Sequence, residues 1–210
     1  MVFTSSVFLF AFLPIVLGLH FLTRKEYRNI FLFLASSAFY FYGEQKMLLL
    51  MYFVIFLNWA TALGINYLSN NITRFKPIYN KFIMGGCIAI CIGLLWYFKY
   101  WNFTLHLFND ICALFGISYK ITKFDKIILP LGISFYTFHV LSYTLDVYMG
   151  KMKADKNLLN FATYVLMFPQ LVAGPIVRYI DIQKQFIGRT ITPLGAANGF
   201  RRLMKYKWKA

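Results

Sequence analysis

The 210-residue chain is 60% hydrophobic and only 14% charged, whereas ordinary soluble domains carry about 25% charged residues. A soluble domain of this size cannot hide so much apolar surface from water. The net charge of +15 does not indicate a nucleic-acid partner, because the 22 Lys and Arg residues are scattered among short hydrophilic connections, where they attract anionic lipid headgroups. The composition therefore predicts a membrane protein whose main partner is the lipid bilayer.

Six stretches of the chain contain no Asp, Glu, Lys or Arg. They are Met1–Thr23, Asn29–Gly43, Met47–Thr73, Phe82–Phe98, Ile127–Leu145 and Asn157–Val177. A bilayer core about 30 Å thick needs roughly 20 mostly apolar residues per spanning helix, because each residue rises about 1.5 Å. The two shortest stretches, the second and the fourth, span only if flanking side chains snorkel or the bilayer thins. We therefore predict an all-α, polytopic membrane protein with about five to seven membrane helices.

The first stretch predicts a retained membrane helix over Val2–Leu22 and not a signal peptide, because it lacks basic residues at its start and a small-residue cleavage site at its end. Basic residues in short connections favour the cytoplasmic side of a membrane. An N-terminus outside the cell places the first and third connections inside and leaves Lys46 alone outside. The inside connections then carry Arg24, Lys25, Arg28, Arg74, Lys76 and Lys81.

The segment after the fourth stretch follows a different pattern. Asn102–Ile117 is mildly amphipathic and contains Asp110, which favours a helix that lies in the membrane interface or is tilted, and not a loop. The fifth helix, Ile127–Tyr148, then returns the chain to the inside, where Lys151, Lys153 and Lys156 follow.

Asn157–Val177 has two interpretations. Pro169, Gly174 and Pro175 interrupt its helical hydrogen bonds. A re-entrant segment would bury this broken backbone in protein or along a watery cavity, and it would keep the basic C-terminal tail inside. A proline-kinked spanning helix is the alternative, and it would place that tail outside.

Polar residues share one face of the fifth helix. His139, Ser142, Tyr143 and Asp146 advance in steps of three or four residues, so this face is predicted to point into the helix bundle or a water-filled cavity. His139 and Asp146 are about 10 Å apart along the helix axis, too far for a direct pair. We therefore expect a hydrogen-bonded structural histidine and not a catalytic one.

No metal site is predicted from the cysteines. Cys87 and Cys91 lie four residues apart on one helix face without a nearby His or acidic residue, which is typical of small packing residues. Cys112 is isolated. The chain also lacks the glycine-rich, nucleophile-elbow and zinc-hydrolase motifs of soluble enzymes.

Two segments carry a family resemblance. GISFYTF at Gly132–Phe138 and FPQLVAGPIVR at Phe168–Arg178, with Ser142-Tyr143 and Asp146–Tyr148 between them, resemble segments of membrane-bound O-acyltransferases. The bacterial alginate O-acetyltransferase branch is the most similar. VFTSSVFLF at Val2–Phe10 and ASSAFYFYG at Ala35–Gly43 also fit this branch.

The resemblance implies a ring of spanning helices around a central pore in a bacterial inner membrane. An acyl donor such as acetyl-CoA or an acylated carrier would enter from the cytoplasm, with no cofactor held by the protein. The acceptor would be an extracytoplasmic polysaccharide or a partner acyltransferase protein. An essential histidine acts as the general base, which suits a group with a pKa near about 6.5. The pore-lining positions that the resemblance implies are Tyr136, His139, Asp146, Gln170 and Arg178.

The chain departs from the family pattern in its C-terminal part. The essential histidine of the family lies well downstream of the Phe-Pro-Gln segment, which places it beyond position 210 here, so the catalytic residue is unknown and His139 does not take that role. Residues 205–210 form an atypical basic tail where relatives continue into an apolar stretch. We expect residues 1–204 to be the N-terminal part of a single membrane domain, a partial ring whose C-terminal half is removed by truncation or supplied by a separate chain.

The predicted function is O-acetyl transfer to an extracytoplasmic polysaccharide, with the chain inactive when alone. A non-enzymatic transport or channel component and an inactive remnant are the alternatives.

Overall fold

The computed structural model describes residues 8–71, 76–115, 129–168 and 177–187, together with the single residues 195, 198 and 201. Every regular element in these ranges is a helix, which confirms the all-α prediction. The α-helices are α1 (Leu13–Leu22), α2 (Arg28–Gly43), α3 (Met47–Asn71), α4 (Lys76–Leu95), α5 (Trp101–Leu114), α6 (Ile133–Tyr148), α7 (Leu158–Leu166) and α9 (Tyr179–Ile187). Single π-helical turns at Phe8–Phe12 and Trp96–Tyr100 precede α1 and α5, and a 3-10 turn at Lys25–Tyr27 precedes α2.

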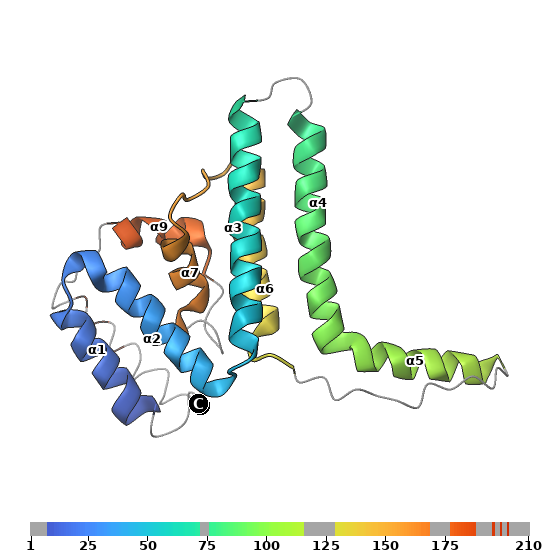
Figure 1. Cartoon of the computed structure of the whole chain (residues 1–210), viewed down its shortest axis with the longest axis horizontal. Coiled ribbons are helices and arrows are strands. Elements are labelled where there is room, and N and C mark those ends of the chain that lie inside the picture. Colours follow the sequence, from blue (N-terminus) through green and yellow to red (C-terminus); the bar gives the residue numbers. More distant parts are fainter. Residues whose placement is uncertain are drawn as a thin grey trace.

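Helices α3, α4 and α6 stand side by side in the centre of the molecule (Figure 1). α2 packs on α7 and α3, α1 lies on the outer side of α2, and α9 contacts α6 and α7. α6 therefore contacts four other helices, α3, α4, α7 and α9. It provides much of the buried core, and its polar face matters most for a functional site.

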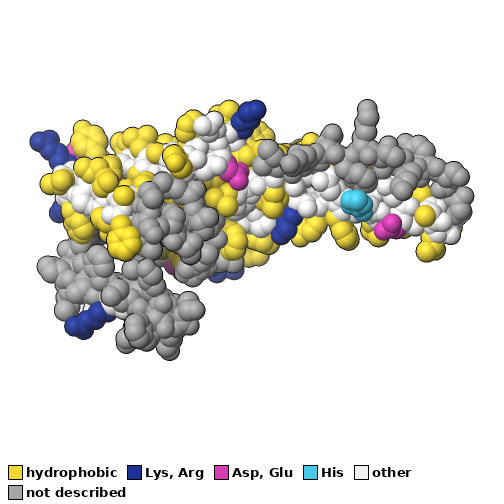
Figure 2. Space-filling view, turned by 90° about the horizontal axis from the view of Figure 1, so that it is seen from below, with side chains coloured by type: hydrophobic (Ala, Val, Ile, Leu, Met, Phe, Trp, Pro, Cys, Tyr) yellow, Lys and Arg dark blue, Asp and Glu magenta, His cyan; other side chains and the backbone are white. Residues whose placement is uncertain are grey.

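Two helical stretches among the described residues are long and apolar enough to cross a bilayer, Met47–Ser69 and Ile78–Leu114. The 23 residues of the first stretch reach about 35 Å, enough for a bilayer core of about 30 Å. Large apolar side chains such as Leu49 on α3 and Phe82 on α4 are exposed, and Figure 2 shows apolar side chains along the described part of the molecule with a few charged groups among them. Such a surface suits lipid tails and not water. The number of membrane helices, about five to seven, stays a prediction.

A π-helical turn bends the longer stretch. As a straight helix its 37 residues would extend about 55 Å, well beyond the bilayer core. At Trp96–Tyr100 the backbone becomes π-helical, a known cause of sharp kinks, and α5 leaves the bundle as a projecting arm (Figure 1, Figure 2). The amphipathic segment after the fourth stretch is thus a helix and not a loop over Trp101–Leu114.

Glycines in the left-handed conformation mark both ends of α6. Gly132 and Gly150 each have a φ of 72°, a region that other residues enter only at a cost. At the C-terminal end the N–H of Gly150 donates to the carbonyl of Val147 (3.0 Å) and the N–H of Lys151 to that of Asp146 (2.9 Å). These two bonds form a Schellman cap, which ends the helix directly after its polar face.

A buried amide joins the three central helices. Asn58 of α3 donates to Cys91 Sγ (3.3 Å) and accepts a hydrogen bond from Cys87 Sγ (3.3 Å), both on α4. Its carbonyl oxygen also accepts from the Thr144 hydroxyl of α6 (2.9 Å). The two cysteines, predicted to be small packing residues, are buried at this contact.

Replacing Asn58 with alanine should lower the free energy of unfolding by about 1–2 kcal/mol, because buried groups on α4 and α6 lose their common partner on α3. Thermal unfolding of the purified chain in detergent measures this change. Thr104→Val is the matched control, since the Thr104 hydroxyl donates within its own helical stretch, to the carbonyl of Tyr100. An Asn58→Ala protein as stable as this control would show that the amide does not hold the central helices together.

Candidate functional site

The polar face of α6 lies inside the helix bundle, as the spacing of its residues predicts. His139, Tyr143 and Asp146 are buried and Ser142 is half-buried. The rings of Tyr143, Tyr164 and Tyr179 pack against one another and against Phe161, which brings α6, α7 and α9 together. This aromatic cluster closes the bundle around the later turns of α6.

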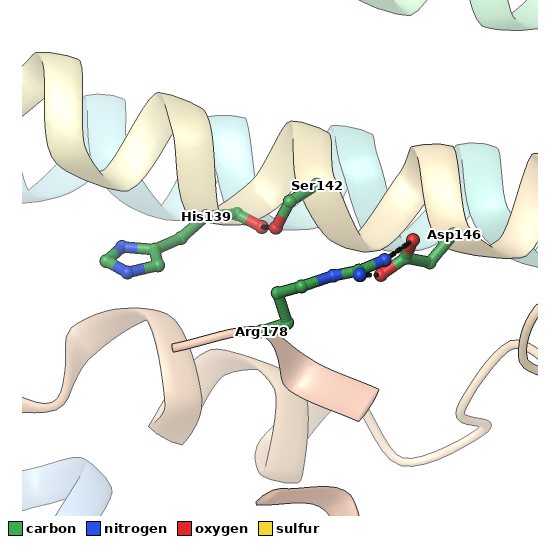
Figure 3. Close-up of polar contacts among 4 residues, drawn as sticks. All are labelled: His139, Ser142, Asp146 and Arg178. Carbon is green, nitrogen blue, oxygen red and sulfur yellow. Dashed lines mark hydrogen bonds and ion pairs between the residues drawn. The ribbon is translucent and has the colours of Figure 1, made fainter. Parts of the chain in front are cut away.

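Asp146 and Arg178 form an ion pair across 32 residues of sequence (Figure 3). Arg178 Nε donates to one carboxylate oxygen at 3.1 Å, and Nη2 donates to the other. Such a bidentate contact between guanidinium and carboxylate is strong and directional. It holds the residue directly before α9 on the polar face of α6, and it brings together two of the five predicted site positions.

The two partners of this ion pair have very different exposure. The Asp146 side chain is 4% exposed and that of Arg178 is 45% exposed. The hydrogen bonds to Asp146, followed by its negative charge, raise the pKa of Arg178 above its usual value. The guanidinium therefore neutralises a buried carboxylate from the outside and still presents its outer edge to solvent.

Asp155, in the connection between α6 and α7, collects bonds from three helices. Its backbone N–H donates to the Tyr143 hydroxyl (2.9 Å) and its carbonyl oxygen accepts from Trp59 Nε1 of α3 (2.9 Å). Its carboxylate accepts from the Tyr179 hydroxyl of α9 at 2.5 Å. The sequence gives little sign of this role, because an acidic residue between Lys153 and Lys156 looks like an ordinary charge in an exposed loop.

Tyr136 and His139 are buried and unsatisfied. Their side chains are 0% and 1% exposed, and neither the Tyr136 hydroxyl nor either ring nitrogen of His139 has a hydrogen-bond partner in the described part of the chain. The His139 ring instead meets Tyr164 edge to face, with 5.5 Å between ring centroids. Within the described part of the chain, the expectation of a hydrogen-bonded histidine ring is therefore wrong, and the Ser142 hydroxyl donates instead to the backbone carbonyl of His139 at 2.8 Å (Figure 3).

The predicted site thus divides into two parts along α6. Asp146 and Arg178 are paired at its C-terminal end, and Tyr136 and His139 lie unsatisfied nearer its middle. Gln170 and most of the proline-containing segment, residues 169–176, lie outside the described residues, so re-entrance of that segment stays a prediction. Among the residues that the structure describes, no group of three or more His, Cys, Asp or Glu side chains could hold a metal ion.

Removing the two members of the ion pair should have unequal effects. Arg178→Ala leaves a carboxylate buried without its partner, which should cost about 3 kcal/mol or more of stability, whereas Asp146→Ala leaves an arginine that can turn to solvent and should cost about 1 kcal/mol. Thermal unfolding in detergent compares the two. The double variant should resemble Asp146→Ala, and equal losses in the two single variants would contradict the buried pairing.

Removing the unsatisfied polar atoms should not destabilise the chain. Tyr136→Phe and His139→Phe should leave the free energy of unfolding unchanged or raise it by up to about 2 kcal/mol, because an unbonded buried polar group is replaced by an apolar one. The unfolding temperature should stay the same or rise accordingly. Tyr164→Phe is the matched control and should lower it, since the Tyr164 hydroxyl donates to the carbonyl of Val177 at 2.8 Å. Losses from Tyr136→Phe as large as those from Tyr164→Phe would show that Tyr136 has a partner in solution.

Comparison with known proteins places the chain in a family. It is 41% identical over 205 residues to the probable alginate O-acetylase of Pseudomonas aeruginosa. The aligned region covers 98% of this chain and 38% of that protein. The corresponding protein of Pseudomonas putida is 40% identical over the same share of this chain and 41% of its own. A peptidoglycan O-acetyltransferase of Helicobacter pylori is 31% identical over 89% of this chain and 38% of that protein.

No family model matches the chain, and no solved structure matches it significantly. The chain spans about two fifths of the length of the curated relatives it matches. The alignment nevertheless covers 98% of this chain, including both segments that carry the predicted resemblance. Over the part of these relatives that it spans, the chain therefore belongs to the alginate O-acetylase-like branch of the membrane-bound O-acyltransferase family.

Proposed function

We propose that the chain forms part of a membrane O-acyltransferase, which moves an acetyl group from a donor such as acetyl-CoA to a hydroxyl of an extracytoplasmic polysaccharide. The observation that carries this proposal is the 41% identity over 98% of the chain to a protein named for alginate O-acetylation. Because the chain spans only 38% of that protein, the proposed activity is that of the longer protein or assembly to which these residues contribute.

The distribution of basic residues supports an orientation in the bacterial inner membrane. The start of α4 and the connection after α6 lie toward the upper end of the bundle in Figure 1. These parts of the chain contain Lys81, Lys151 and Lys153. By the positive-inside tendency this end faces the cytoplasm. The start of α1, at the opposite end, is then extracytoplasmic.

In this proposal the polar face of α6 lines part of the path along which donor and acceptor meet. Arg178, partly exposed and fixed by Asp146, is suited to a phosphate group of the donor, because arginine recognises such anions through directed hydrogen bonds. Tyr136 and His139 offer unsatisfied polar atoms deeper along the same face. Gln170 is assigned to the same path from the family resemblance.

The chemistry proposed is the attack of an acceptor hydroxyl on the carbonyl carbon of the donor thioester. The new C–O bond forms as the C–S bond breaks, the thiolate leaves, and the hydroxyl proton passes to a general base. We assign the base to a histidine outside these 210 residues. The residues described above bind and orient, and a partner acyltransferase protein on the extracytoplasmic side is a further proposed acceptor of the acetyl group.

A chimera tests this proposal. The chain replaces the matching segment of the Pseudomonas aeruginosa alginate O-acetylase, and acetylation of alginate is measured in cells that lack the native protein. We expect acetylation to be restored, and we expect Arg178→Gln in the chimera to reduce it about tenfold or more, with Lys184→Gln on the neighbouring α9 as a control that retains it.

A chimera that accumulates in the membrane but leaves alginate unacetylated would contradict the proposed function. Solute flux through liposomes that contain the chain, without any dependence on an acyl donor, would instead favour a transport component.

A further inference from the structure

An apolar groove of about 640 Å³ lies between α2, α3 and α7. Its lining side chains come from all three helices and are Phe33, Tyr52, Ile55, Phe56, Leu158, Leu159 and Ala162. Phe56 is more than half exposed, so the groove is open along one side. A space of this volume with so apolar a lining suits a hydrocarbon chain and not a polar ligand.

One end of the groove lies beside basic residues. Leu158 and Leu159 begin α7 directly after Lys153 and Lys156, which are both exposed. The α2 wall begins with Arg28, and α2 is tied to α7 at this point by a hydrogen bond from Asn29 to Asn160 (2.9 Å). The bond from Trp59 to the carbonyl of Asp155 holds the α3 wall against the same connection.

Acidic groups at this end do not cancel the positive charge. Asp155 keeps its negative charge, but the two exposed lysines Lys153 and Lys156 outnumber it, and its carboxylate faces the Tyr179 hydroxyl and the N–H of Asn157 (2.8 Å). In the segment from the end of α1 to the start of α2, the one acidic residue, Glu26, is outnumbered by Arg24, Lys25 and Arg28. The groove therefore combines a hydrocarbon-lined body with a cationic end.

We propose that this groove binds one acyl chain of an anionic phospholipid such as phosphatidylglycerol, with the phosphate at Lys153 and Lys156. A zwitterionic lipid matches the apolar body equally well but lacks the net negative charge that the lysines attract. The bound chain fills the space between α2, α3 and α7, where the helices leave a gap. This inference does not depend on the proposed acyl transfer.

Trp59 provides a built-in reporter for the bound lipid. Its ring centroid lies 6.0 Å from that of Phe56, which lines the groove. In a variant of the full chain with Trp96, Trp101 and Trp208 changed to Phe, only Trp59 fluoresces. The variant is placed in vesicles that contain either phosphatidylglycerol or phosphatidylcholine brominated near the carboxyl end of the acyl chain, at equal mole fraction, and the quenching is compared.

We expect brominated phosphatidylglycerol to quench Trp59 more strongly than brominated phosphatidylcholine. The preference should fall about fivefold for each lysine removed by Lys153→Gln and Lys156→Gln. Ala162→Phe, which fills the groove, should reduce quenching by both lipids. A variant that retains only Trp101, beyond the bend after α4, should show quenching that does not change when Lys153 and Lys156 are replaced.

Equal quenching by the two lipids, or a preference that survives the loss of both lysines, would overturn the proposal. Unchanged quenching in an Ala162→Phe protein that keeps its helicity would show that the lipid sits outside the groove. If Ala162→Phe fails to fold, the surface lysine variants decide the question alone.

Discussion

The polar groups of α6 have to find partners inside the protein, because in apolar surroundings an unpaired polar group or charge costs several kcal/mol. The packing of the other helices around α6 follows largely from which of them carry these partners. Thr144 reaches Asn58 on α3, Tyr143 reaches the backbone of Asp155, and Asp146 reaches Arg178 before α9. Each contact fixes a different element around α6, so one helix with a polar face organises the bundle.

Local spacing predicted the features that a single helix determines, and it missed those that depend on distant partners. The step of three or four residues placed His139, Tyr143 and Asp146 on one inward face, and amphipathicity identified α5 as a helix. Elements far apart in sequence are joined by the pairing of Asp146 with Arg178 and by the hydrogen bonds of Asn58 and Asp155. Periodicity carries no information on which faces meet, and a charged loop residue looks the same whether or not it is bonded.

Two side chains on α6 are exceptions to this pairing. Tyr136 and His139 are buried yet unsatisfied in the described part of the chain, where a purely structural helix would carry apolar residues. Sites of binding or catalysis commonly break the rules of packing in this way, because their polar atoms are kept for a ligand. Family membership and this unsatisfied face together support the proposal that α6 contributes to an acyl transfer path, while the proposed lipid groove on the other side of α7 belongs to the contact with the bilayer.

The central claim, that the other helices are organised around α6, can be tested by hydrogen–deuterium exchange of the chain in lipid nanodiscs. Backbone amides of α6 should exchange much more slowly than those of α5, although both are helices, because four helices pack on α6 whereas α5 projects from the bundle. Amides of α6 that exchange as fast as those of α5 would contradict the account.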